Sequence, residues 1–163
     1  MKYLVFSDSH GETKLMHNIV KNACLDDSPP EGIIFLGDCL NDIQKIQRDF
    51  PNFTYHIVAG NCDFMSPAPV EKLLDFDNTK ILITHGHRYG VKSGHDRILT
   101  AALQMGADAA FFGHSHIPII LQKNSITLLN PGSITEPRGG QARESYAVVE
   151  IIGGKILPRI IEV

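Results

Sequence analysis

The chain has 163 residues, 43% of them hydrophobic, and its length is that expected of a single domain with one substantial core. Its formal net charge is -3, and its sequence shows no basic stripe that would bind a nucleic-acid backbone, so nucleic acid is not an expected partner. No apolar stretch is long enough to cross a bilayer, and the N-terminus turns polar too early for a signal peptide. The sequence therefore predicts a cytoplasmic protein with no membrane partner.

Five short apolar runs, each bounded by polar residues or glycine, predict buried strands. They lie at residues 2–6, 33–36, 55–59, 80–84 and 109–112, and we expect them to form an inner sheet framework. Between the first two runs, apolar residues recur from Leu15 to Cys24 at spacings of three and four, which predicts an amphipathic helix. Helices are also expected at residues 42–49 and 93–105, and further strands at 118–121, 126–129, 145–152 and 155–161.

Polar side chains follow each of the five early strands at its C-terminal end. The clusters are Asp8-Ser9-His10, Gly37-Asp38, Gly60-Asn61, His85-Gly86-His87 and Gly113-His114-Ser115-His116. Ligands bind at this edge of open α/β sheets, because the loops that leave it converge on a crevice. Donors two residues apart in an extended segment point to the same face. We therefore expect three pairs to present donors to one centre: Asp8 with His10, His85 with His87, and His114 with His116.

The number and chemistry of these donors predict a metal centre. Any one histidine alone would be assigned an ordinary polar role, but five of the eight lie in the clusters, leaving only His17, His56 and His95 outside them. Imidazole, carboxylate and carboxamide donors suit Mn²⁺, Fe, Zn²⁺ or Ni²⁺ better than Ca²⁺ or Mg²⁺ alone. There are too many donors for one ion, so we expect two divalent cations about 3.5–4 Å apart, bridged by a carboxylate. Asp38 is the best candidate for the bridge, and the glycines before Asp38, Asn61 and His114 allow sharp turns there.

The cysteines favour no other kind of site. Cys24, Cys39 and Cys62 are odd in number and form no C-x-x-C pair, which argues against a disulfide framework and against a thiolate zinc site. We expect all three to be reduced thiols.

The order of the motifs DxH, GD, GN, HGH and GHSH resembles that of the calcineurin-like metallophosphoesterases, in particular their short bacterial and archaeal phosphodiesterase subgroup, across essentially the whole chain. The resemblance implies one α/β domain over residues 1–163, a four-layer α/β/β/α sandwich of two mixed β-sheets flanked by helices. It also implies a metal-dependent phosphodiesterase in which a hydroxide bridging two metal ions attacks phosphorus. The two ligand sets that it implies are Asp8, His10, Asp38 and His116 for the first ion, and Asp38, Asn61, His85 and His114 for the second.

The same resemblance favours Mn²⁺ as the metal, with Ni²⁺, Zn²⁺ and Fe as alternatives, and a small phosphodiester as the substrate. It is also compatible with a homo-oligomer, but the sequence does not determine the oligomeric state. The candidate catalytic residues are Asp38, Asn61, Cys62 and His87. Neither the natural substrate nor its pathway follows from motifs that specify only chemistry at phosphorus.

One position departs from the larger family members, which carry a phosphate-contacting histidine where this chain has Cys62. A neutral thiol is a poor substitute for imidazolium near neutral pH, so we expect water or His87 to assist the leaving group. For Cys62, a small packed residue beside the site is as well supported as a functional contact. For His87, a role in binding phosphate or supporting a ligand is favoured over a purely structural one. Phe64 and Met65 could form an apolar lip for a substrate, but core or interface packing is the favoured role.

Two other functions are compatible with this scaffold. A related eukaryotic retromer subunit is a protein-interaction platform with a degraded metal site, so the alternative here is a non-catalytic, metal-binding scaffold of the same fold. The complete set of ligand positions favours the enzyme. A nuclease like the larger DNA-repair members is disfavoured, because the chain has neither extra domains nor a basic groove.

Overall fold

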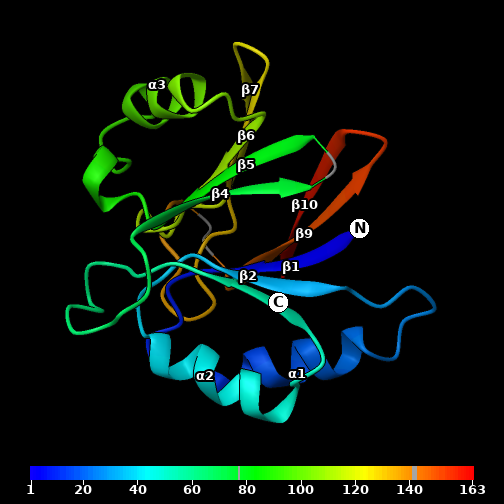
Figure 1. Cartoon of the computed structure of the whole chain (residues 1–163). Helices are drawn as coiled ribbons and strands as arrows, with labels where there is room; N and C mark the ends of the chain where they lie inside the picture. Colours follow the sequence, from blue (N-terminus) through cyan, green and yellow to red (C-terminus); the bar gives the residue numbers. More distant parts are fainter. Residues whose placement is uncertain (77, 141–142) are drawn as a thin grey trace.

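The computed structural model describes residues 1–76, 78–140 and 143–163, and shows two β-sheets packed face to face with helices on the outside (Figure 1). The first sheet has the strand order β10-β9-β1-β2-β3. Its strands are β1 (Lys2–Phe6), β2 (Gly32–Phe35), β3 (Thr54–Ile57), β9 (Ser145–Ile152) and β10 (Lys155–Glu162). Strands β1, β2 and β3 are parallel, whereas β9 is antiparallel to both β1 and β10, so the sheet is mixed.

The second sheet has the order β4-β5-β6-β8-β7 and is mixed as well. Its strands are β4 (Glu71–Phe76), β5 (Thr79–Thr84), β6 (Ala109–Phe111), β7 (Ile119–Lys123) and β8 (Ile126–Asn130). Strands β5, β6 and β8 run parallel, and the hairpin partners β4 and β7 run antiparallel at the two edges.

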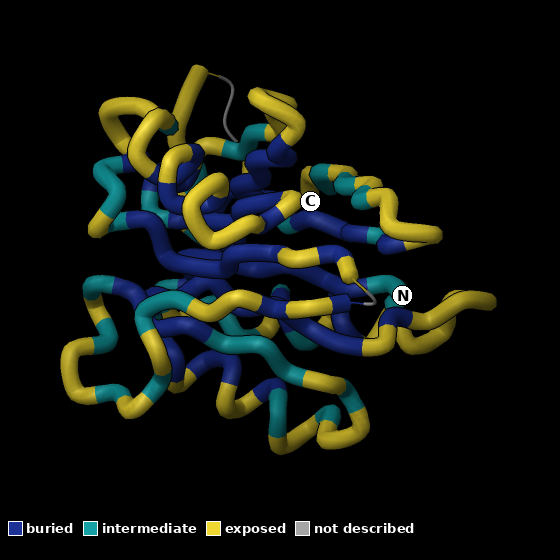
Figure 2. The backbone as a smooth tube through the Cα atoms, turned by 45° about the horizontal axis from the view of Figure 1, so that its top comes forward, coloured by how far each residue is buried: buried dark blue, intermediate teal, exposed yellow. Residues whose placement is uncertain are grey.

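The alternation of apolar side chains along β1 shows why the layers form. Tyr3 and Val5 pack into the core between the sheets, whereas Leu4 and Phe6 point outward beneath two helices. These helices are α1 (Thr13–Ala23) and α2 (Leu40–Asp49). On the outer face of the second sheet, α3 (Asp96–Gln104) packs against β6 and β8, preceded along the chain by the short 3₁₀ helix η1 (His87–Tyr89). Buried segments therefore fill the central layers (Figure 2).

The predicted four-layer sandwich is confirmed, but the placement of the five early strands in one framework is wrong. Strands β1, β2 and β3 lie in the first sheet, and β5 and β6 lie in the second. The sequence analysis missed β4 because this edge strand buries only Leu74 and Phe76 and therefore contains no continuous apolar run. The third helix begins at Asp96, later than the expected residue 93.

Within the part of the chain that the structure describes, no helix is both long and apolar enough to cross a membrane.

Candidate metal centre

The predicted donor clusters lie on loops that leave the C-terminal ends of strands, and several of their residues adopt an unusual backbone conformation. Strands β1 and β2 run from right to left in Figure 1, so the loops that follow them gather at one end of the molecule. Left-handed φ angles occur at Asp8 (54°), His10 (38°), Asp38 (64°), His114 (64°) and His116 (58°). This conformation costs an L-residue about 1–2 kcal/mol, and such strain is typical of functional sites. The extended geometry assumed for the paired donors is therefore wrong.

The first donor cluster consists of Asp8, His10 and His116, whose candidate ligand atoms all lie within 4.8 Å of one another. Asp8 Oδ1 is 3.1 Å from His116 Nε2. Among the described residues, Asp8 Oδ1 and His10 Nε2 find no hydrogen-bond partner although both are buried. The other oxygen of Asp8 accepts hydrogen bonds from Ser7 Oγ at 2.6 Å and from the His114 amide at 3.0 Å. One carboxylate oxygen is thus fixed in place while the other is left available to a cation.

The second donor cluster consists of Asp38, His85 and His114, again with their ligand atoms within 4.8 Å. His85 Nδ1 lies 2.8 Å from the Leu36 carbonyl oxygen, to which it donates, so in the neutral ring Nε2 carries the free lone pair. That nitrogen is 3.4 Å from Asp38 Oδ2, 3.2 Å from Asn61 Oδ1 and 3.2 Å from His114 Nδ1. This convergence of lone pairs matches the requirements of a bound cation.

The two clusters adjoin, because His85 Nε2 also lies 3.8 Å from Asp8 Oδ1. The neighbours His114 and His116 divide between the clusters, in agreement with the two ligand sets that the family resemblance implies. His114 belongs to the second cluster and His116 to the first. His87 joins neither, but its ring centre lies 5.5 Å from that of His85 and 6.1 Å from that of His114.

Hydrogen bonds fix the orientation of the ligand rings. His116 Nδ1 lies 2.7 Å from the Glu136 carbonyl oxygen, so it donates there and leaves Nε2 facing Asp8. A metal-ligating histidine is commonly held in this way through its second nitrogen, which sets both tautomer and direction. His85 and His116 are therefore oriented as ligands would be.

The electrostatics of the site favour carboxylates that are ionised and histidines of unequal basicity. Burial alone raises the pKa of Asp8 and of Asp38, but contacts with His116 and His85 outweigh it and lower both. Burial likewise lowers the pKa of His85 and of His116, but the adjacent carboxylates reverse this and raise both. For His114, burial and the nearby His85 lower the pKa to about 4, so this ring is neutral near pH 7.

Two glycines are required at the site because other groups approach them closely. A Cβ atom at Gly60 would collide with the Asp38 carboxylate, and one at Gly113 would collide with Ser7 Oγ and lie 2.6 Å from Asp8 Oδ2. The reason at these two positions is space rather than the sharp turn expected from the sequence, whereas Gly37, before Asp38, has the left-handed φ of a turn (94°).

Asp63 is a supporting residue that the sequence analysis missed. Its Oδ2 accepts from the backbone amides of Asp38 at 2.9 Å and Gly60 at 2.8 Å. Its Oδ1 accepts from those of Cys39 at 3.0 Å and Leu40 at 2.9 Å, where α2 begins. One carboxylate thus fastens the loop of Asp38 to the loop of Asn61 and also caps α2.

Other polar groups tie the remaining loops together. Buried Asp42 accepts from Ser9 Oγ at 2.8 Å and from the Gly11 amide at 2.7 Å, which anchors the loop of His10 to α2. Ser133 Oγ donates to the Asp8 carbonyl at 2.8 Å, and buried Asn130 donates to the Gly113 carbonyl at 2.8 Å. In the sequence, a carboxylate that accepts several backbone amides cannot be distinguished from a solvated surface residue. The only sequence signal for these supporting residues is that Ser, Thr, Asn and Asp occur close to the motifs.

Cys62 is exposed and its side chain lies outside both donor clusters. Its amide donates to Asp38 Oδ1 at 2.8 Å, and burial and the Asp38 carboxylate raise the pKa of its thiol to about 11. The backbone of Cys62 therefore orients Asp38 while its side chain remains a neutral thiol. Cys24 and Cys39 are free as well, as expected.

His87 has a buried Nδ1 that finds no partner among the described residues. Burial, the neighbouring His85 and Arg88 lower the pKa of His87, so its ring is neutral near pH 7. Of the histidines expected outside the site, His17 lies beside Asp49, His56 packs against Tyr3 and Phe76, and His95 packs against Phe112.

A cavity of ≈ 690 Å³ opens beside the first cluster and includes His10, Cys39, Cys62 and Lys45 in its lining. Phe64 and Met65 also line it, with exposed fractions of 87% and 97%. Core packing is therefore wrong for these two residues, because they stand in solvent at the rim of the cavity, whereas packing at an interface stays a prediction.

Comparison with known proteins identifies the family. The model of the calcineurin-like phosphoesterase superfamily domain matches residues 1–154. The chain is 35% identical over 152 residues to a probable metallophosphoesterase, YsnB, of Bacillus subtilis (strain 168), covering 93% of this chain and 85% of the relative. It is 26% identical over 172 residues to the phosphodiesterase YfcE of Escherichia coli (strain K12), covering 92% and 88%.

Solved structures agree with this result. A predicted phosphoesterase from Streptococcus pneumoniae TIGR4 superposes with a TM-score of 0.79 at 27% identity, covering 99% of this chain and 88% of that one. A Vps29 variant from Entamoeba histolytica superposes with a TM-score of 0.76 at 18% identity, covering 100% and 99%, which shows a shared fold alone. The extent of the family match and the identity to YsnB together show that the chain belongs to the calcineurin-like phosphoesterase superfamily.

Proposed function

We propose that this phosphoesterase-family chain is a phosphodiesterase with a dinuclear metal centre. The observation that carries the proposal is the convergence of carboxylate oxygens and imidazole nitrogens in two adjoining clusters, some of them buried without a hydrogen-bond partner among the described residues. Such groups are costly to bury unless a cation binds them. The donor set fits divalent metal ions.

In this proposal Asp8, His10, Asp38 and His116 hold the first ion, and Asp38, Asn61, His85 and His114 hold the second. Asp38 is the bridging ligand. The mixed nitrogen and oxygen donors suit Mn²⁺, Ni²⁺, Zn²⁺ or Fe, and of these we propose Mn²⁺. When bound, the ions lower the pKa of a coordinated water and neutralise negative charge at phosphorus.

The residues of the chain have distinct tasks in this reaction. Asp63 and the Cys62 amide hold Asp38 in position, and the Leu36 carbonyl orients His85. A thiol whose pKa is raised to about 11 is a poor proton donor to a leaving group, so we assign no proton transfer to Cys62. His87, with its unpartnered nitrogen, contacts the substrate phosphate or assists the leaving group, alongside water.

We further propose that residues 1–163 act as one domain in the cytoplasm on a small phosphodiester, with self-association as an additional property of the chain. The name of the relative YfcE supports a diester substrate. A non-catalytic scaffold is the competing function, and the Vps29 likeness at 18% identity supports only the fold on which it would be built.

The test is hydrolysis of bis(p-nitrophenyl) phosphate and p-nitrophenyl phosphate by chelator-stripped protein, with Mn²⁺, Ni²⁺, Zn²⁺ or Mg²⁺ restored separately. We expect metal-dependent cleavage of the diester that is lost in Asp38→Asn. Absence of turnover with every metal, in protein that demonstrably binds two ions, would refute the enzyme and favour the scaffold.

A further inference from the structure

A second cavity, of ≈ 450 Å³, lies between α1 and α2 and has a marked positive charge, so the expectation that the chain has no basic groove is wrong at this place. Lys14, Lys45 and Arg48 line it, against the single carboxylate of Asp49. The local charge of this cavity is therefore opposite in sign to the formal net charge of the chain, which is -3. We call this cavity the interhelical groove.

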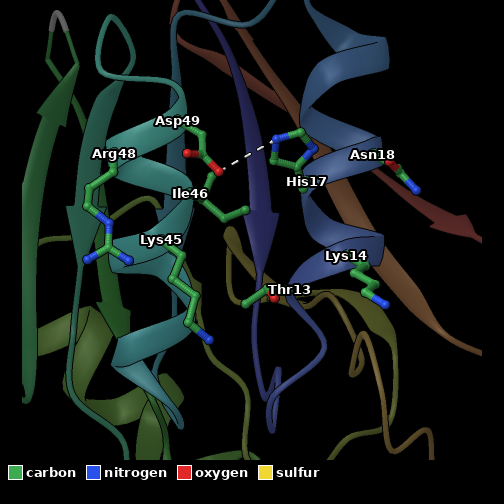
Figure 3. A pocket seen from close by; sticks show the side chains of 8 residues that line it. All are labelled: Thr13, Lys14, His17, Asn18, Lys45, Ile46, Arg48 and Asp49. Carbon is green, nitrogen blue, oxygen red and sulfur yellow. Dashed lines mark ion pairs between the residues drawn. The ribbon is translucent and has the colours of Figure 1, made fainter.

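The groove lies between two helices that both begin close to loops of the metal centre. Helix α1 begins at Thr13, shortly after His10, and α2 begins at Leu40, shortly after Asp38, so the positive ends of both helix dipoles lie at the site. Figure 3 shows the ammonium groups of Lys14 and Lys45 extending toward the same end of the groove, on either side of Thr13.

The one carboxylate of the groove lies at its other end. Asp49 Oδ2 is 3.6 Å from His17 Nε2, and this pair spans the two helices away from the ammonium groups (Figure 3). The end nearest the metal loops is therefore cationic and carries the two lysines.

Lys45 connects the groove to the metal centre, because it also lines the cavity that contains His10 and Cys62. Its Nζ lies 3.5 Å from Asp42 Oδ1, while Asp42 Oδ2 accepts from Ser9 Oγ and the Gly11 amide. The residue that anchors the loop of His10 therefore also holds the lysine beside that loop. Lys45 is thus a lining residue of both cavities.

We propose that the interhelical groove binds a second phosphate group of the substrate, so that the preferred substrates are phosphodiesters bearing an additional phosphate. The inference rests on the proposed phosphodiesterase function and specifies its substrate class. The reacting phosphate lies at the metal ions, and the additional phosphate contacts Lys45 and Lys14. A diester without it binds only at the metal centre and the adjoining cavity.

The experiment compares two chromogenic diesters on the Mn²⁺-loaded full chain. They are the p-nitrophenyl ester of thymidine 5′-phosphate and the same compound with a 3′-phosphate, which differ only in the second phosphate. We expect kcat/KM to be roughly tenfold higher for the 3′-phosphorylated compound at low ionic strength, since two cations contact it, and the advantage to shrink as salt is added.

Two variants and a control locate the effect. Lys14→Gln and Lys45→Gln should each reduce the advantage of the 3′-phosphate by roughly threefold to fivefold, because each removes one charged donor. Lys14→Gln should leave kcat/KM for the unphosphorylated diester unchanged, and it spares the contact between Lys45 and Asp42. Lys21 is an exposed residue of α1 outside the groove lining, so Lys21→Gln should change kcat/KM for neither substrate.

Equal kcat/KM for the two diesters, or an advantage that Lys14→Gln leaves intact, would overturn the inference while the proposed function stands. No release of p-nitrophenol from either compound by metal-loaded protein would instead overturn the proposed function itself.

Discussion

Asp63→Asn is the substitution whose effect follows most directly from the geometry. The wild-type carboxylate accepts four backbone amides, two on each oxygen, at 2.8–3.0 Å. An asparagine of the same shape keeps one oxygen, so two amides lose their acceptor and face an amide nitrogen instead. A buried N–H left unpaired costs about 1–3 kcal/mol, and loss of the charge at the start of α2 costs about 0.3–1 kcal/mol more.

These amides are only partly buried, so water replaces some of the lost bonding. We therefore expect the free energy of unfolding to fall by about 2–3 kcal/mol, which lowers the melting temperature by roughly 5–10 °C in a domain of this size. Because the loops of Asp38 and Asn61 are no longer fastened together, the Kd for Mn²⁺ should rise by at least about tenfold.

The assays are urea unfolding of the metal-free protein and calorimetric titration with Mn²⁺. Asp26→Asn is the matched control, because it makes the same chemical change at an exposed carboxylate whose partner is Lys2 at 3.2 Å. The control should lose no more than about 1 kcal/mol. If Asp63→Asn matches the control in both stability and metal affinity, the role assigned to Asp63 is wrong.

The remaining predictions concern the metal ligands and the leaving group. Asp38→Asn should weaken binding of both ions and nearly abolish turnover, as measured by elemental analysis and diester hydrolysis, and normal activity in the metal-replete variant would refute the bridging role. If a missing general acid limits the rate, Cys62→His should increase activity on diesters with poor leaving groups. Cys62→Ser should change kcat only moderately. Identical rates for wild type and Cys62→His would show that no acid is missing at this position. Metal affinity should rise with pH, because the pKa values of His85 and His116 are raised by the neighbouring carboxylates and both rings must release a proton to bind metal. Below those raised pKa values affinity should be lost, and calorimetry in buffers of different ionisation enthalpy should detect the released protons; a binding enthalpy independent of buffer would contradict this.

The donor clusters were predictable from the sequence because each follows an apolar run and because five of the eight histidines lie in them. The division of strands between the two sheets was not predictable in the same way. An apolar run such as residues 80–84 indicates a buried strand, but its partners are fixed by contacts with segments far away in the chain, such as β6. The edge strand β4 was missed since most of its side chains are exposed.

The residues that support the donors could not be predicted from local sequence patterns either. Asp63 and Asp42 are charged residues of the kind usually found on a solvated surface. They support the site because the fold brings backbone amides within hydrogen-bond distance of their carboxylates. Left-handed residues turn the backbone, so His114 and His116 lie in different clusters, which the spacing of the donors alone did not predict. The two ligand sets implied by the family resemblance do separate these histidines. Residue identity thus predicted which loops meet at the site, and tertiary contacts determined which residues support them; that the site binds metal stays a prediction.

The central claim is that two metal ions share one site, and Mn²⁺ titration of the metal-free protein followed by electron paramagnetic resonance tests it most directly. The account predicts two ions per chain, with the six-line signal of the first ion lost to exchange coupling when the second binds beside it. A persistent six-line signal from a single bound ion, or from two ions that do not interact, would contradict it.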